Sequence, residues 1–177
     1  MSDDPLARAE AEPRQPVVLL HGVTNNARVW DPVLPFLPGH LDVLVPTALG
    51  HSGGLPVRPE DCPLTVRAII DDLERQMDAA NLSAAHLAGN SMGGWAALEL
   101  ARRGRALSVC AFSPAGTWGT EGRPETNKRL KSALRLARLT RPVAPVVLRS
   151  ALVRRWAMRL NANHGDRIPR SHLLDII

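Results

Sequence analysis

A glycine-rich pentapeptide around one serine is the segment of the chain best suited to chemistry. Gly89-Asn90-Ser91-Met92-Gly93 follows an apolar run and precedes a run of strong helix formers. In a G-x-S-x-G sequence between a strand and a helix, small residues allow a sharp turn, which exposes the serine hydroxyl and frees the next backbone N–H. The pattern therefore predicts a nucleophile at Ser91 and an oxyanion donor at the Met92 amide. The alternative is a turn in which Ser91 only caps the helix.

His21-Gly22 ends another apolar run and is the second candidate for site chemistry. In a parallel sheet, the carboxyl ends of the strands line the ligand crevice. A glycine at such an end lets the backbone approach a reacting carbonyl, and the main-chain N–H of Val23 would then be the second oxyanion donor. Taken alone, His21-Gly22 favours a strand-ending turn with a packed histidine. Together with Ser91, it predicts an oxyanion hole.

A serine nucleophile needs a general base, and the sequence offers only weak candidates for it. His51, in Gly50-His51-Ser52, follows a neighbouring strand, and a base must lie within hydrogen-bond reach of the nucleophile. We therefore expect a structural role for His51. Downstream of Ser91 the histidines are His164 and His172, and a makeshift pair of His164 with Asp166 is the less favoured alternative.

The elements that must position these residues alternate along the chain. Short apolar runs predict strands at 17–20, 41–45, 84–88 and 107–112. Helical spacing of apolar side chains predicts a helix at 64–80, and a run of strong helix formers predicts one at 95–103. A helix around 27–37 is also expected, made irregular by Pro32 and Pro35. This alternation indicates an α/β fold, a parallel sheet with helices on both sides. After Gly116 the pattern changes to basic amphipathic helices at 124–140 and 146–160.

In order and spacing, four segments resemble the α/β-hydrolase superfamily: 17–22, 49–52, 87–94 and 112–116. The resemblance implies a partial α/β-hydrolase fold with Ser91 as nucleophile and the backbone amides of Val23 and Met92 as the oxyanion hole. His21, Gly22, Gly89 and Gly93 complete the motifs. It also implies three segments, namely a mobile tail at 1–15, the N-terminal part of the hydrolase core at 16–120, and an incomplete helical cap at 121–177.

The activity implied by the resemblance is that of a serine hydrolase. The substrate would be a small ester, lactone or related acyl compound, and serine in place of aspartate argues against the haloalkane dehalogenase and epoxide hydrolase branches. In this family the catalytic acid and histidine follow the cap, whereas this chain ends within it, so we expect impaired activity. Thr47 also stands where many members carry aspartate. The alternative is a non-catalytic α/β-hydrolase-like binding protein, or a gene fragment, with a basic surface segment.

Composition excludes several other classes of protein. The chain of 177 residues is 45% hydrophobic, and no apolar run approaches the roughly 18 residues of a membrane-spanning helix. The N-terminus lacks the apolar region of a secretory signal, so a cytoplasmic location is expected. The two cysteines fit neither a disulfide framework nor zinc, and we expect no metal and no cofactor.

The charge of the chain is concentrated at its C-terminal end. Residues 121–177 hold 13 Lys and Arg against 4 Asp and Glu. Because no aromatic cluster accompanies these charges, no nucleic-acid partner is expected. The expected partner is a small acyl substrate. A solvated cap surface is the preferred interpretation of the basic segment, and weak contact with anionic membrane surfaces is the alternative.

Overall fold

The computed structural model describes residues 14–59, 62–117, 123–159 and 162–175. The chain divides into two compact units, residues 1–117 and 118–177, and each is described by itself. Most of the expected tail lies outside the described residues. The first strand begins at Gln15, whose N–H donates to the carbonyl of His40.

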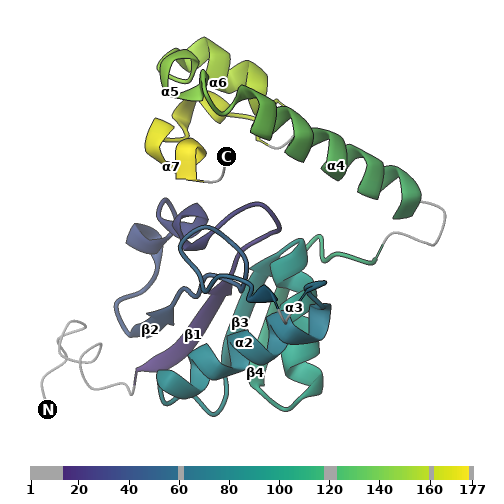
Figure 1. The fold of residues 1–177 in the computed structure, drawn as a ribbon. Coiled ribbons are helices and arrows are strands. Elements are labelled where there is room, and N and C mark those ends of the chain that lie inside the picture. Colours follow the sequence, from purple (N-terminus) through teal and green to yellow (C-terminus); the bar gives the residue numbers. More distant parts are fainter. Residues whose placement is uncertain (1–13, 60–61, 118–122, 160–161, 176–177) are drawn as a thin grey trace, which may run out of the picture. The chain divides into compact units, whose positions relative to one another are not determined.

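Unit 1 is built on a parallel sheet, as the sequence predicts (Figure 1). Its strands are β1 (Gln15–Leu20), β2 (Leu41–Leu44), β3 (Ala85–Asn90) and β4 (Ala106–Phe112). They lie in the order β2-β1-β3-β4, and all neighbouring pairs are parallel. The carboxyl ends of β1 and β3, which carry the predicted site residues, are therefore adjacent.

One face of this sheet is covered by two helices, α2 (Val66–Ala79) and α3 (Met92–Arg102). Thr65 begins α2 by accepting a hydrogen bond from the Ala68 amide, which satisfies one free donor of the first turn. The inward side chains of β1, β3 and both helices, together with Ala48 from the loop after β2, form one hydrophobic core: Val18, Leu20, Ala48, Ile70, Leu73, Met77, Ala85, Leu87, Ala96, Ala97 and Leu100. Arg103, directly after α3, donates to Asp71 and Glu74 and so ties the helices together at the surface.

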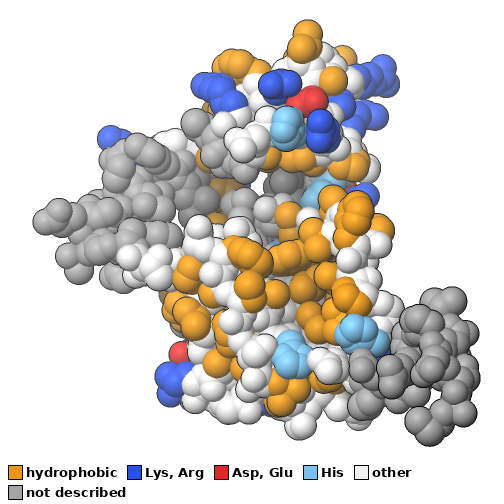
Figure 2. Space-filling model, turned by 180° about the vertical axis from the view of Figure 1, so that it is seen from behind, with side chains coloured by type: hydrophobic (Ala, Val, Ile, Leu, Met, Phe, Trp, Pro, Cys, Tyr) orange, Lys and Arg blue, Asp and Glu red, His pale blue; other side chains and the backbone are white. Residues whose placement is uncertain are grey.

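The opposite face carries no α-helix among the described residues of unit 1. The predicted helix at 27–37 is wrong, because the chain forms two short 3-10 helices there, η1 (Ala27–Trp30) and η2 (Leu34–Phe36). Pro32 and Pro35 lack the N–H that a continuous helix requires. On β4 the alternate residues Ser108, Cys110 and Phe112 are exposed. Figure 2 shows hydrophobic side chains gathered on the side of unit 1 that faces away from the viewer in Figure 1.

Unit 2 consists of helices around a small core. They are α4 (Arg123–Thr140), α5 (Ala144–Val147), α6 (Ala151–Ala157), the 3-10 helix η5 (Gly165–Arg167) and α7 (Arg170–Asp175). The predicted single helix at 146–160 is wrong. The Ser150 hydroxyl accepts from the Val153 amide and starts a new helix at Ala151. Ala144, Leu148 and Leu173 form the core of the unit. None of the described helices is long and apolar enough to cross a bilayer.

Candidate active site

Ser91 occupies a sharp turn between a strand and a helix, which confirms the local structure predicted from the pentapeptide. β3 ends at Asn90 and α3 begins at Met92, so Ser91 alone joins them. Its backbone has φ 54° and ψ −112°, a conformation that is strained for a residue with a side chain. The surrounding backbone holds it there. The Ser91 N–H donates to Phe112 O (2.9 Å), and the Ser91 carbonyl accepts from the amides of Trp95 (3.0 Å) and Ala115 (2.9 Å).

Two glycines make this turn sterically possible. A Cβ on Gly93 would lie 2.1 Å from the carbonyl oxygen of Leu20, in β1. A Cβ on Gly89 would lie 2.3 Å from the carbonyl carbon of Gly93. These contacts are with backbone atoms, which cannot rotate away as a flexible side chain does. Gly89 and Gly93 therefore let the first turn of α3 pack directly against the ends of β1 and β3.

Gly22 lies beside Ser91 at the end of β1. A Cβ built on Gly22 would be 3.5 Å from the Cβ of Ser91 and 3.3 Å from Oδ1 of Asn90. Within the described residues, the amides of Val23 and Met92 donate no hydrogen bond to the protein. Gly22 and Ser91 are therefore neighbours in space, and Val23 and Met92 are the residues that follow them in the sequence. That the amides of both point at one oxygen atom near the Ser91 hydroxyl stays a prediction.

His21 is buried and holds the loop that contains Gly22. Its Nε2 accepts from the Ala48 amide (3.0 Å), so the ring proton lies on Nδ1, which donates to the Gly22 carbonyl (2.8 Å). Burial lowers the pKa of His21 from 6.5 to about 4. Its bond to Gly22 acts in the opposite direction, and the nearby ring of His51 lowers the pKa further. His21 is therefore a neutral structural link at neutral pH.

A hydrogen-bond chain that the sequence did not reveal continues from this link into α2. Gln76 donates through Nε2 to the carbonyl of Thr47 (3.0 Å) and to Oδ2 of the fully buried Asp72 (2.8 Å). Thr47 precedes Ala48, so α2 fixes the loop that in turn fixes His21. A polar residue within the apolar stripe of a predicted helix, as Asp72 is, was the available signal.

The structure brings no base to Ser91 among the residues it describes. The Ser91 hydroxyl has no hydrogen bond to a histidine or a carboxylate in that part of the chain. His51 lies edge-on to His21, with ring centroids 5.0 Å apart. In unit 2, the nearest cation to the Asp166 carboxylate is Arg155, at 3.9 Å, and no hydrogen bond joins Asp166 to His164 within the described residues.

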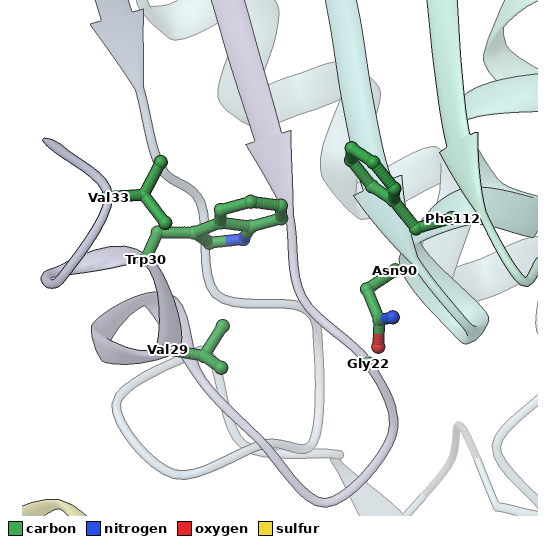
Figure 3. Close-up of a pocket in the computed structure, with 6 residues that line it drawn as sticks. All are labelled: Gly22, Val29, Trp30, Val33, Asn90 and Phe112. Carbon is green, nitrogen blue, oxygen red and sulfur yellow. The ribbon is translucent and has the colours of Figure 1, made fainter. Parts of the chain in front are cut away.

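A cavity of about 320 Å³ in unit 1 is bordered by Asn90, the residue that precedes Ser91. Its walls are mainly apolar and come from three places in the fold: the end of β1, the η1 region and the ends of β3 and β4. The lining residues are Gly22, Val29, Trp30, Val33, Asn90 and Phe112 (Figure 3). Of these, the sequence motifs had included Gly22, Asn90 and Phe112, but not Val29, Trp30 and Val33. No group of three metal-binding side chains occurs among the described residues.

Comparison with known proteins identifies the family of the chain. The model of the alpha/beta hydrolase family matches residues 17–175, and the chain belongs to that family. The epoxide hydrolase EphH of Mycobacterium tuberculosis is 52% identical over 50 residues, which cover 28% of this chain and 23% of that protein. RutD of Caulobacter sp., provisionally named a carbamate hydrolase, is 36% identical over 92 residues, which cover 51% of this chain and 33% of that protein.

The solved structures show the same fold at low sequence identity. A hydrolase from Pseudomonas aeruginosa PA01 matches with a TM-score of 0.59 and 21% identity, over 92% of this chain and 64% of that one. A marine microorganism esterase matches with a TM-score of 0.58 and 18% identity, over 92% of this chain and 59% of that one. In the comparison with EphH and RutD, the chain spans a third or less of the length of those curated relatives.

Proposed function

We propose that Ser91 is the nucleophile of a serine hydrolase that acts on a small ester or related acyl compound. The observation that carries the proposal is the strained backbone of Ser91, held by hydrogen bonds from two segments of the chain. Such strain is costly and persists only where the surrounding structure imposes it, as it does at active sites. A helix cap needs no such conformation, since cap residues adopt ordinary extended angles.

The proposed reaction is acyl transfer. The Ser91 oxygen attacks the substrate carbonyl carbon, and the carbonyl oxygen becomes an oxyanion that accepts hydrogen bonds from the Val23 and Met92 amides. The Ser91 hydroxyl proton passes to solvent water, since no described side chain is hydrogen-bonded to accept it. Collapse of the intermediate breaks the bond between the carbonyl carbon and the leaving alkoxide, which takes a proton from water and departs as the alcohol. The acyl group stays on Ser91 as an ester until water hydrolyses it. His21 supports the reaction indirectly, because it binds the Gly22 carbonyl, which belongs to the same planar peptide group as the Val23 N–H, and so helps to fix the orientation of that N–H.

Slow turnover is part of the proposal. The serine hydroxyl is a weak nucleophile until a base takes its proton, and Ser91 has no such partner among the described residues. Oxyanion stabilisation and binding alone retain about 10³- to 10⁴-fold catalysis over water. This chain is therefore expected to hydrolyse activated esters slowly.

The similarity to an epoxide hydrolase raises a second candidate reaction, which the chemistry of serine disfavours. Attack of a serine oxygen on an epoxide carbon would form an ether. An ether has no carbonyl at which water could attack to release the product, so the serine would remain alkylated. An acyl group on Ser91, in contrast, is an ester that water hydrolyses. Ester hydrolysis is therefore the reaction that this site supports best.

The test measures hydrolysis of p-nitrophenyl acetate and of styrene oxide by the full chain. The matched variants are Ser91→Ala and Ser83→Ala, since Ser83 is an exposed serine outside the site. We expect slow ester hydrolysis that Ser91→Ala removes and Ser83→Ala retains, with no diol from the epoxide. Ester hydrolysis equal in all three proteins would instead favour the non-catalytic binding protein, and diol formation would favour the epoxide reaction.

For unit 2 we propose a cap role with a weak affinity for anionic membrane surfaces. Large apolar side chains are exposed on its helices beside arginines, among them Leu139 on α4 and Trp156 on α6. Arg159 lies over the Trp156 ring, 4.4 Å from its centroid. Basic amphipathic helices bind anionic lipid through both features. Sedimentation with phosphatidylserine vesicles but not with phosphatidylcholine vesicles, reduced by Trp156→Ala, is the expected result. Equal sedimentation with both would contradict it.

A further inference from the structure

We propose that Asp72 and Gln76 of α2 are positioning residues, which act through Thr47 to hold the amide of Val23 in place as an oxyanion donor. Both side chains are hydrogen-bonded to protein groups outside the nucleophile turn, so they would act on the reaction without touching the substrate. The inference rests on the proposed function for the role of the Val23 amide, whereas the hydrogen bonds that orient this amide belong to the structure of unit 1.

The first part of the connection runs from α2 to His21 through one peptide group. Gln76 Nε2 donates to the carbonyl oxygen of Thr47, at 3.0 Å. That carbonyl belongs to the peptide group whose N–H, on Ala48, donates to Nε2 of His21, also at 3.0 Å. Because a peptide group is planar and rigid, holding its oxygen also fixes the direction of its N–H. Gln76 therefore controls how well the Ala48 N–H is aligned with the His21 ring.

The second part of the connection repeats this arrangement between His21 and the site. His21 Nδ1 donates to the carbonyl oxygen of Gly22 (2.8 Å), and the N–H of that peptide group is the Val23 amide. Every hydrogen bond in the series points from α2 toward this amide, and hydrogen bonds in such a chain polarise and strengthen one another. Gln76 thus acts on both the direction and the donor strength of the Val23 N–H.

The loop that carries Val23 depends on this support, because its backbone is strained. Thr24, the next residue, has φ 66°, which is unfavourable for a β-branched side chain. Such a conformation persists only where the surrounding structure imposes it. Beyond Thr24, the Ala27 amide donates to the Thr47 hydroxyl, at 3.2 Å. Thr47 therefore holds the loop at both ends, directly through its hydroxyl and indirectly through its peptide group and His21.

Asp72 determines which end of the Gln76 amide faces Thr47. Its fully buried carboxylate accepts from Gln76 Nε2 (2.8 Å) and from Arg75 Nη2 (3.2 Å). A carboxylate and a carbonyl both accept hydrogen bonds, so only the NH2 end of the amide can bind the two together. A buried carboxylate is costly unless hydrogen bonds satisfy it, which holds Gln76 in this orientation.

The experiment observes the Gly22-Val23 peptide group directly. Gly-Val occurs once in the sequence, so a full chain labelled with 13C at glycine carbonyls and 15N at valine gives a single carbonyl-to-amide NMR correlation. Gln76→Met keeps an unbranched side chain of similar length and removes both donated hydrogen bonds. The matched control is Ile70→Val, because Ile70 is a fully buried core residue of the same helix. We expect Gln76→Met to move the correlation and Ile70→Val to leave it in place.

The second readout is the rate at which p-nitrophenyl acetate acetylates Ser91. Removing a whole oxyanion donor lowers a rate by about 10²- to 10³-fold, so a donor that is only misaligned should lower it by about tenfold. We expect this reduction in Gln76→Met with the KM for the ester unchanged, because the donor acts in the transition state. Ile70→Val should react at the wild-type rate. Should Gln76→Met fail to fold, Thr47→Val, which removes the hydroxyl that holds Ala27, replaces it with the same expected results.

The inference is overturned if the Gly22-Val23 correlation stays in place in Gln76→Met, or if Ile70→Val moves it as far. It is also overturned if Ser91 is acetylated equally fast in the wild type and in Gln76→Met, a result that leaves the proposed function intact. If the wild-type chain takes up no acetyl group at Ser91, the proposed function fails. The NMR correlation, which needs no reaction, then decides alone whether α2 positions the Val23 amide.

Discussion

Replacing Ser91 with glycine is expected to yield a more stable protein than replacing it with alanine. Alanine must adopt the same φ of 54° and ψ of −112°, and such strained conformations cost about 1–3 kcal/mol in a residue with a Cβ. Glycine adopts them freely but loses about 0.5–1 kcal/mol more chain entropy on folding. The free energy of unfolding of Ser91→Gly should therefore exceed that of Ser91→Ala by about 1–2 kcal/mol.

Native-state hydrogen exchange of amides in β1 and β3 measures this difference, because those amides report the stability of unit 1 alone. The matched control is Ser83, an exposed residue with an ordinary negative φ. At Ser83 the order should be reversed, with alanine more stable than glycine by about 0.4–1 kcal/mol. If the alanine variant at position 91 is as stable as the glycine variant or more stable, as expected at position 83, then the turn stores no strain and the reasoning fails.

Two further predictions concern the packing and the link around this turn. Gly93→Ala should lower the free energy of unfolding by about 2 kcal/mol, because overpacking against Leu20 costs up to about 3 kcal/mol and alanine regains about 1 in a helix. Gly39→Ala, where a Cβ meets nothing within 4 Å, should leave the free energy of unfolding nearly unchanged. If urea unfolding gives equal losses of stability for Gly93→Ala and Gly39→Ala, the close packing of Gly93 against Leu20 is contradicted. Because burial lowers the pKa of His21 to about 4, the unfolded chain binds the proton more readily between that pH and 6.5. The contribution of His21 to the free energy of unfolding should therefore be complete above pH 6.5 and fall by about 3 kcal/mol as the pH drops to 4. If the free energy of unfolding of His21→Gln depends on pH as steeply as that of the wild type, the prediction is wrong.

The sequence predicts the sheet and the turn because both depend on local patterns. Residues 17–20 of β1 form a continuous apolar run, which is typical of a strand in the interior of a parallel sheet. Around Ser91 the small residues leave the backbone few alternatives, so the strand, the turn and the helix could be placed within a few residues. The same holds for β4, predicted at 107–112 and found at Ala106–Phe112.

Features that depend on contacts between distant segments were not predictable in this way. The bond from Gln76 to the Thr47 carbonyl joins residues 29 apart in sequence, and it forms only once α2 packs on the sheet. The cavity needs Trp30 and Phe112 from different segments of the chain. The continuous helices expected at 27–37 and 146–160 do not form, for local reasons. Pro32 and Pro35, already expected to make the first helix irregular, divide it into two short 3-10 helices, and the capping hydroxyl of Ser150 starts a separate helix within the second segment.

The most direct test of Ser91 as nucleophile is to locate the acetyl group after the full chain reacts with p-nitrophenyl acetate. None of the described residues gives Ser91 a hydrogen-bonded base. Water should therefore remove an acyl group from Ser91 slowly, and the acetylated protein should accumulate. Peptide mass spectrometry should then find acetyl on Ser91 in the wild type, and not on alanine in Ser91→Ala. Acetyl groups found only on lysine side chains, with Ser91 unmodified, would contradict the assignment of Ser91 as the nucleophile.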